Sequence, residues 1–167
     1  VVLLVVTWGL VMLPVGLKLI SGPGCPVCVT AQRHIDAAIE LATNKQVIIA
    51  TYGDMLRVPG RLGSLERLRA EGARVEIVNS ASSALSLARS HPADVVVFLA
   101  VGFETTAPAT AVVVQEADRE KVGNFSVLMC HKRVVPAMLA LLADGQSALD
   151  GFLCPGHVSV IIGSAAY

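Results

Sequence analysis

Residues 94–101, Asp-Val-Val-Val-Phe-Leu-Ala-Val, give the strongest strand signal in the chain, because seven apolar residues follow one another without interruption. A strand that is buried on both faces needs such a run, whereas a strand with one solvated face alternates apolar and polar residues. We therefore predict that residues 94–101 form a central strand of a parallel sheet that helices cover on both faces.

Predicted strands and helices alternate on both sides of this central strand. Further strands are expected over residues 1–6, 46–50, 74–78, 125–129 and 152–153, and helices over residues 30–42, 64–71, 80–89, 105–118 and 135–142. Such alternation indicates an α/β fold with an open parallel sheet. We expect roughly five or six strands, with right-handed crossovers between them.

The composition limits the possible functions. Hydrophobic residues make up 54% of the chain and charged residues 16%, which indicates extensive burial. The net charge is zero, so nothing favours nucleic-acid binding or electrostatic attachment to a membrane. Residues 1–17 are uncharged but interrupted by Gly9, Pro14 and Gly16; we interpret their beginning as a buried strand, with a membrane helix as the alternative. The four cysteines do not resemble a secreted disulfide framework, so a cytoplasmic location is expected.

A second stretch, residues 21–30, reads Ser-Gly-Pro-Gly-Cys-Pro-Val-Cys-Val-Thr and places two thiols in a rigid turn before a helix. Its glycines and prolines prevent a regular strand or helix, and amides at the following helix start favour a thiolate. Cys25 and Cys28 therefore form either a redox dithiol or half of a metal site, with two structural thiols as the third option. We predict that Cys25 and Cys28 can form a disulfide with each other.

Polar side chains follow the predicted strands at the points where the strands end. Ligands of open parallel sheets bind at these carboxyl ends. The predicted cleft residues are Asp54, Glu104, Thr105, Thr106 and His157. We expect their loops to converge on one cleft together with the turn that carries the two thiols.

Each of these residues also has a simpler structural interpretation. Asp54 can cap a turn, and Glu104 with the threonines after it can begin a helix. His131 precedes Lys132 and Arg133, so we interpret it as solvated. Cys130 and Cys154 are expected to end neighbouring strands and to contribute packing only.

Several common functional motifs do not occur in the sequence. It contains no GxGxxG or GxxxxGK[ST] phosphate loop, no second Cys-x-x-Cys and no Gly-x-Ser-x-Gly elbow. Polar residues at the sheet edge and a dithiol, without a cofactor motif, favour the handling of a metal or its ligands. A stand-alone thiol–disulfide oxidoreductase and a non-catalytic metal-binding scaffold stay open as alternatives.

Four motifs, in this order, resemble the HypD family of hydrogenase maturation proteins. They are Gly22-Pro23-Gly24-Cys25-Pro26-Val27-Cys28, Thr51-Tyr52-Gly53-Asp54-Met55 with Arg57-Val58-Pro59-Gly60, Gly102-Phe103-Glu104-Thr105-Thr106-Ala107-Pro108, and Pro155-Gly156-His157-Val158-Ser159. The resemblance runs from about residue 13 to residue 167. It identifies residues 1–167 as the central α/β part of a HypD-like protein, somewhat under half of a full-length member, with an extension over two α/β lobes as an open alternative.

This resemblance implies a scaffold and redox role in the assembly of the Fe(CN)2CO centre of nickel–iron hydrogenases. In the family, two α/β lobes surround a cleft, and a further region carries a four-iron, four-sulfur (4Fe–4S) cluster. A HypC-type chaperone and a HypE-type cyanide donor are the implied partners. Carried over, Cys25 and Cys28 would be the redox dithiol, and Glu104, Thr105, Thr106 and His157 would line the cleft.

The sequence departs from the family pattern in three places. The iron-holding cysteine of the family belongs to a Cys-Gly-Gly-His-Thr motif expected just upstream of the match, and residues 1–12 contain no cysteine. The cluster ligands are expected beyond Tyr167, and Ala31 stands where we expect proline. We therefore expect residues 1–167 alone to lack complete activity; their metal ligands stay unknown, and so does whether they form an enzyme.

Overall fold

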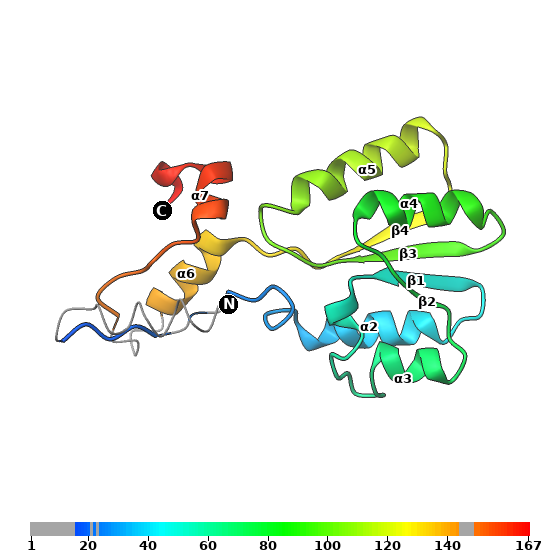
Figure 1. The fold of residues 1–167 in the computed structure, drawn as a ribbon, viewed down its shortest axis with the longest axis horizontal. Coiled ribbons are helices and arrows are strands. Elements are labelled where there is room, and N and C mark those ends of the chain that lie inside the picture. Colours follow the sequence, from blue (N-terminus) through cyan, green and yellow to red (C-terminus); the bar gives the residue numbers. More distant parts are fainter. Residues whose placement is uncertain (1–15, 21, 23, 144–148) are drawn as a thin grey trace.

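A parallel sheet of four strands forms the centre of the described part of the protein, in the order β2-β1-β3-β4 (Figure 1). The computed structural model describes residues 16–20, 22, 24–143 and 149–167. The strands are β1 (Val47–Thr51), β2 (Val75–Ile77), β3 (Val95–Ala100) and β4 (Phe125–Met129). The predicted α/β fold with a parallel sheet is confirmed. The strand expected over residues 1–6 lies outside the described residues.

The two central strands are β1 and β3, as the apolar run at residues 94–101 predicts. They pair from Val47 opposite Val95 to Ala50 opposite Phe98. All of β1 and most of β3 are buried. From β1 the chain first adds β2 on one side and then crosses back to place β3 on the other side. The direction of winding therefore reverses between β1 and β3, which is where open α/β sheets bind their ligands.

Helices cover both faces of the sheet (Figure 1). On one face, α2 (Gln32–Ala42) and α3 (Leu65–Ala70) pack against side chains such as Ile49 and Leu99. On the other face, α4 (Ala81–Ser90) and α5 (Ala107–Arg119) pack against Ile48 and Phe98. Because neighbouring residues of a strand point to opposite faces, the continuous apolar runs supply both cores.

Short polar contacts fix where the elements begin. The side chains of Ser64 and Ser80 accept hydrogen bonds from the N–H groups of Arg67 and Ser83, and so cap α3 and α4. The Asn124 amide donates to three carbonyl groups, those of Ala88, His91 and Asp94, and holds the start of β4 beside β3.

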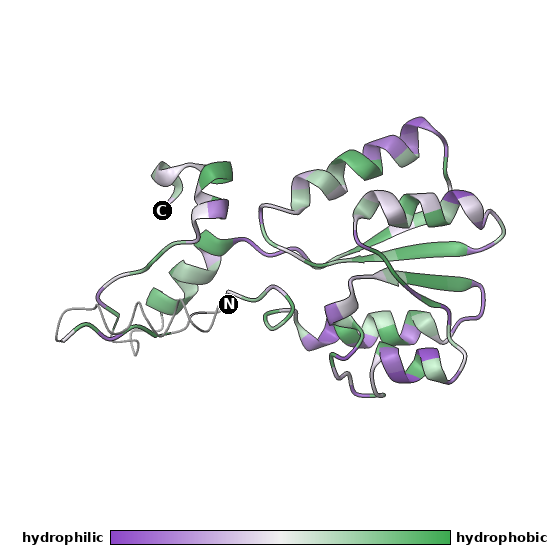
Figure 2. Ribbon diagram, in the orientation of Figure 1, coloured by the Kyte–Doolittle hydropathy of each residue, from purple (hydrophilic) through white to green (hydrophobic). Residues whose placement is uncertain are grey.

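Two helices follow the sheet, α6 (Val134–Ala143) and α7 (Gly156–Ile162). The strand predicted over residues 152–153 is wrong, because this segment has no regular structure and Leu153 is 87% exposed. Two apolar residues without a neighbouring strand cannot form a ladder. Figure 2 shows α6 coloured towards the hydrophobic end of the scale, yet none of its residues is buried. Among the described residues, no helix is both long and apolar enough to cross a membrane.

Candidate functional site

The candidate site lies at the edge of the sheet where the strands end. The loops that follow β1, β3 and β4 leave the sheet at this edge, and the beginning of α2 lies at the same end (Figure 1). The turn with the two thiols immediately precedes α2. The parallel topology therefore brings three of the four sequence motifs to the same end of the sheet.

The thiol turn is closed by its own backbone and anchored by one apolar side chain. The carbonyl of Cys25 accepts the N–H of Val29 at 3.2 Å, and the Thr30 hydroxyl donates to the carbonyl of Pro26 at 2.8 Å. Val27 packs against the core between the sheet and α2. Both thiols remain exposed and free. The apolar residue of Cys-Pro-Val-Cys thus fixes the turn while its sulfurs face solvent.

The two sulfurs have different electrostatic environments. The N–H of Cys28 donates to Sγ of Cys25 at 3.3 Å. The pKa of Cys25 is lowered, first by a hydrogen bond from the Cys28 side chain and then by that N–H, while the charge of Asp54 acts in the opposite direction. The same side-chain hydrogen bond raises the pKa of Cys28. The structure thus brings Asp54 into the electrostatic range of the thiol pair.

A second motif braces the helix behind the thiols. Asp36 of α2 accepts the N–H of Arg61 at 2.8 Å, and the Gln32 amide donates to the carbonyl of Pro59 at 3.1 Å. Gly60 approaches α2 so closely that a Cβ there would collide with the Ile39 side chain. Residues 57–61, which we call the clamp loop, therefore hold α2 in place. Because the thiol turn immediately precedes α2, the clamp loop also fixes the position of that turn.

Glu104 connects the loop after β3 to α6. Its Oε1 accepts the N–H of Val134, the first residue of α6, at 2.8 Å, while its Oε2 is buried without a hydrogen-bond partner. The interpretation that Glu104 begins its own helix misses this role, because the carboxylate caps a helix thirty residues further along. Thr106 donates to the carbonyl of Phe103 at 3.0 Å, and Thr105 is exposed.

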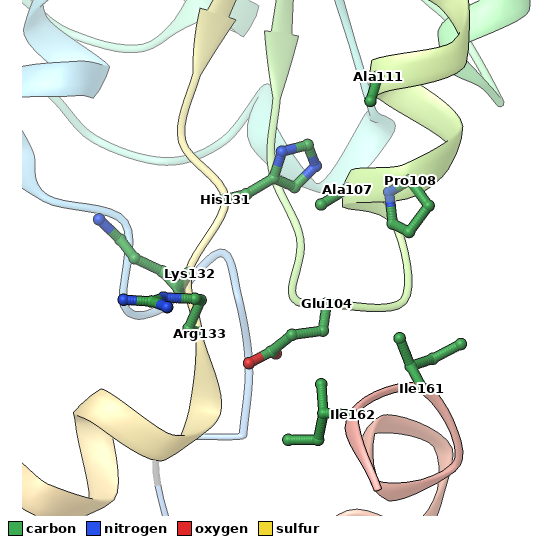
Figure 3. A pocket seen from close by; sticks show the side chains of 9 residues that line it. All are labelled: Glu104, Ala107, Pro108, Ala111, His131, Lys132, Arg133, Ile161 and Ile162. Carbon is green, nitrogen blue, oxygen red and sulfur yellow. The ribbon is translucent and has the colours of Figure 1, made fainter. Parts of the chain in front are cut away.

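A cavity of about 410 Å³ lies beside Glu104, lined also by His131, Lys132 and Arg133 of the loop between β4 and α6 (Figure 3). The interpretation of His131 as a solvated residue holds only in part, because the residue is half-buried. Its ring lies beside Ala107 at the start of α5 (Figure 3), its Nε2 is buried without a partner, and burial lowers its pKa. The sequence could not show this, because the two charged neighbours of His131 suggest a solvated loop.

The same loop borders a second cavity, of about 450 Å³, on the side of the thiol turn. Val29, which follows Cys28 directly, and Phe103 contribute to its walls together with residues 131–133. The β4–α6 loop therefore separates a cavity beside the thiol turn from a cavity beside Glu104.

The predictions for His157, Cys130 and Cys154 have different outcomes. His157 is exposed on α7, and the cavity beside Glu104 is lined from that helix by Ile161 and Ile162. The convergence of His157 with Asp54 and Glu104 stays a prediction. Cys130 directly follows β4 and is buried in the core, whereas Cys154 is exposed in an irregular segment. The expectation that both cysteines end neighbouring strands is therefore wrong.

Two polar residues near this edge have no counterpart among the predicted site residues. His34 Nδ1, in the first turn of α2, and Thr51 Oγ1, at the end of β1, are buried without hydrogen-bond partners. The pKa of His34 is lowered, first by burial and then by the charges of Arg33 and Lys132. The position of Thr51 at the end of a predicted strand is visible in the sequence, whereas the sequence gives no sign that His34 Nδ1 is buried.

The described residues do not by themselves form a metal centre. No group of three or more His, Cys, Asp or Glu side chains in the described part of the chain gathers in a way that could hold a metal ion. A 4Fe–4S cluster requires about four cysteine ligands, and the thiol turn offers two. The cluster ligands that the family resemblance implies are expected beyond Tyr167, so the 4Fe–4S cluster stays a prediction for an intact family member.

Comparison with known proteins identifies the family. The HypD family model, described as "Hydrogenase formation hypA family", matches residues 4–167. The chain is 46% identical over 156 residues to hydrogenase maturation factor HypD of Escherichia coli (strain K12), covering 93% of this chain and 42% of that protein. It is 52% identical over 163 residues to hydrogenase maturation factor HypD of Azotobacter vinelandii, covering 93% and 43%.

An archaeal relative shows the same coverage. The putative hydrogenase expression/formation protein MJ0993 of Methanocaldococcus jannaschii is 47% identical over 156 residues, which cover 93% of this chain and 43% of that protein. The chain thus spans about two-fifths of the length of the curated relatives that it matches. The thiol turn, its clamp, the Glu104 loop and the start of α7 all fall within the matched residues, and the chain belongs to the HypD family.

Proposed function

We propose that this chain acts in hydrogenase maturation, as the dithiol-bearing part of a scaffold on which the Fe(CN)2CO centre of a nickel–iron hydrogenase is assembled. The observation that carries the proposal is the exposed Cys25–Cys28 turn, in which the N–H of Cys28 donates to the Cys25 sulfur. The names of the relatives, which are hydrogenase maturation factors, supply the biological context.

The proposed chemistry is a reversible oxidation of the dithiol. When the two thiols become a disulfide, they release two electrons and two protons. In this proposal the iron with its cyanide and carbon monoxide ligands is a substrate of the scaffold. The dithiol supplies electrons that are used while this iron centre is assembled. A 4Fe–4S cluster, whose ligands are expected beyond Tyr167, is the proposed electron partner in an intact family member.

The other motifs support the dithiol in this proposal. Asp36 and Gln32 hold α2 through the clamp loop, and Glu104 holds the start of α6 through the N–H of Val134. Thr105, Thr106 and His157 are proposed as further cleft residues. A HypC-type chaperone and a HypE-type cyanide donor are the proposed partners, and the cytoplasm is the proposed location.

A segment replacement in a relative tests the proposal. The matching segment of the Escherichia coli relative is replaced by this chain, and hydrogenase activity is measured in a strain that lacks its own copy of that gene. We expect activity from the chimaera and its loss after Cys25→Ala or Cys28→Ala. Cys154→Ala is the matched control, because Cys154 is an exposed thiol outside the turn. Full activity in both turn variants would contradict the redox role.

The exposure of both turn sulfurs also favours a second candidate, a stand-alone thiol–disulfide oxidoreductase. The two candidates differ in their dependence on the rest of the maturation machinery. Equilibration of the 167-residue chain with glutathione redox buffers gives the reduction potential of the pair, and turnover of a model disulfide gives its catalytic rate. The oxidoreductase is favoured if the chain alone turns over the model disulfide while Cys25→Ala and Cys28→Ala leave the hydrogenase activity of the chimaera unchanged.

A further inference from the structure

We infer that Cys25 is the attacking cysteine of the pair and that Cys28 is the resolving cysteine. This inference rests on the proposed redox function and assigns an order to its two thiols. It depends on the geometry of the turn, which treats the two sulfurs differently although both are exposed.

The turn directs a backbone hydrogen-bond donor at the first sulfur. Sγ of Cys25 accepts the N–H of Cys28 at 3.3 Å, and the carbonyl of Cys25 accepts the N–H of the next residue, Val29, at 3.2 Å. A hydrogen bond to an ionised acceptor is stronger than one to a neutral acceptor. The N–H of Cys28 therefore stabilises the thiolate of Cys25 more than its thiol.

The directions of the two pKa shifts agree with this geometry. The hydrogen bond from the Cys28 side chain is the largest influence that lowers the pKa of Cys25, and the same bond raises the pKa of Cys28. Asp54 is the charged side chain that opposes the Cys25 thiolate. The donors of the turn outweigh Asp54, so the first thiolate forms at Cys25.

The reaction with a disulfide R–S–S–R then follows in two balanced steps. The Cys25 thiolate attacks one sulfur, which forms a Cys25–S–R bond and releases one R–S⁻. Cys28 loses its proton to solvent, and its thiolate attacks Sγ of Cys25, which forms the Cys25–Cys28 disulfide and releases the second R–S⁻. Overall two protein thiols are oxidised and one disulfide is reduced to two thiols.

Alkylation of single variants tests the order. Iodoacetamide rates are measured against pH for Cys25 in Cys28→Ala and for Cys28 in Cys25→Ala, both in the 167-residue chain, with the tryptic peptide 19–33 followed by mass spectrometry. The N–H of residue 28 persists in Cys28→Ala, so Cys25 should titrate at the lower pH. At neutral pH the rate ratio should be about three- to fourfold per unit of pKa difference, because a lower pKa also reduces nucleophilicity. Equal rates, or a faster Cys28, overturn the inference.

Glutathione disulfide tests the chemical roles directly. Cys28→Ala should accumulate a mixed disulfide at Cys25 rapidly, Cys25→Ala should form one at Cys28 slowly, and the wild type should proceed to the internal disulfide. An internal disulfide in the wild type, with Cys28 the faster single cysteine, overturns the order but preserves the redox function. A wild type that forms no internal disulfide and reacts no faster than free glutathione contradicts the proposed function itself.

A charge-removal variant sharpens the same test. Asp54→Asn removes the carboxylate that opposes the Cys25 thiolate, so alkylation of Cys25 in the Cys28→Ala background should shift to lower pH. Asp118→Asn is the matched control, because Asp118 is an exposed carboxylate near the end of α5 that pairs with Lys121. If Asp54→Asn leaves the pH profile of Cys25 alkylation unchanged, the Asp54 charge does not influence the pKa of Cys25.

Discussion

The sheet and the two C-terminal helices use apolar residues in opposite ways. In the sheet, β1 is buried along its whole length and β3 along most of it, and the helices on both faces complete two apolar clusters. In contrast, α6 is composed of apolar residues, most of them green in Figure 2, and buries none of them. The neighbouring α7 buries only Val158.

This contrast shows that hydrophobicity alone does not indicate which part of the chain is stable. An apolar helix gains stability from packing, because an isolated helix of ten residues is marginal in water. The sheet region has that packing, whereas α6 is joined to it by contacts such as the bond from the Val134 N–H to Glu104 and that from the Lys132 N–H to the carbonyl of Gly102. The free energy of unfolding should therefore depend mainly on the sheet.

The largest expected effect comes from the centre of the sheet. Phe98 is fully buried on β3, and its ring meets that of Tyr52 edge to face at 5.6 Å. Phe98→Ala should lower the free energy of unfolding by about 3–5 kcal/mol in urea titrations. Leu139→Ala on α6 is the control, since that side chain is 61% exposed and should change stability by less than about 0.5 kcal/mol. Similar losses in both variants would refute the contrast between the regions.

The next effect is expected at the loop after β3. A Cβ at Gly102 would collide with the Thr106 side chain, so Gly102→Ala should cost about 1–3 kcal/mol through overpacking. Thr106→Ala should relieve part of this cost, which a double-mutant cycle in urea measures. At Gly123, by comparison, a Cβ has open space, and Gly123→Ala should be nearly neutral. Strict additivity of Gly102→Ala and Thr106→Ala would mean that the collision is not the cause.

A smaller effect is expected at the junction between the two regions. Glu104→Ala removes the acceptor of the Val134 N–H and should cost about 1 kcal/mol, as the loss of a helix cap does. Hydrogen exchange should become faster at the Val134 amide and stay unchanged in β1 and β3. Glu40→Ala on the exposed side of α2 provides the comparison. Faster exchange throughout the sheet would show that the two regions are not separable.

The smallest expected effect is the contribution of the Arg74–Asp94 ion pair to the stability of the sheet at low pH. The hydrogen bond from Arg74 is the main cause that lowers the pKa of Asp94, and the pair joins the starts of β2 and β3. Because the folded-state pKa lies below the unfolded value of about 3.9, the stabilisation is present above that pH and disappears as pH falls through the folded-state pKa. Urea titrations from neutral pH downwards should show a smaller acid loss for Asp94→Asn than for the wild type. Asp118→Asn should follow the wild-type curve, because Asp118 and Lys121 are both more than 80% exposed.

The sequence predicts the sheet well because burial leaves a strong pattern. The uninterrupted apolar run at residues 94–101 can be satisfied only between two layers, and β3 is indeed central. The pattern fails at residues 152–153, where two apolar residues resemble a strand but no neighbouring strand pairs with them. A strand needs a partner, and two residues do not indicate whether one exists.

The candidate site is predictable only where its residues are local. The Cys25–Cys28 turn follows from its own glycines and prolines, and Asp54 follows from its place after β1. The bond between Glu104 and the N–H of Val134 and the buried Nε2 of His131 arise from the packing of distant loops. Three of the four motifs mark the sheet edge where the candidate site lies, but the sequence does not show which of their polar atoms have hydrogen-bond partners.

The strand order also has a kinetic consequence. Val47 of β1 pairs with Val95 of β3, so the two central strands can meet only after a long loop closes, and β4 must then join β3. Parallel sheets of such high contact order fold slowly. Cys130, which directly follows β4 and is buried in the core, should become protected from a labelling reagent late in folding. The exposed Cys154, outside the sheet, should stay reactive throughout. Pulse labelling of Cys130 during refolding therefore measures the rate of sheet assembly, with Cys154 as the unprotected reference.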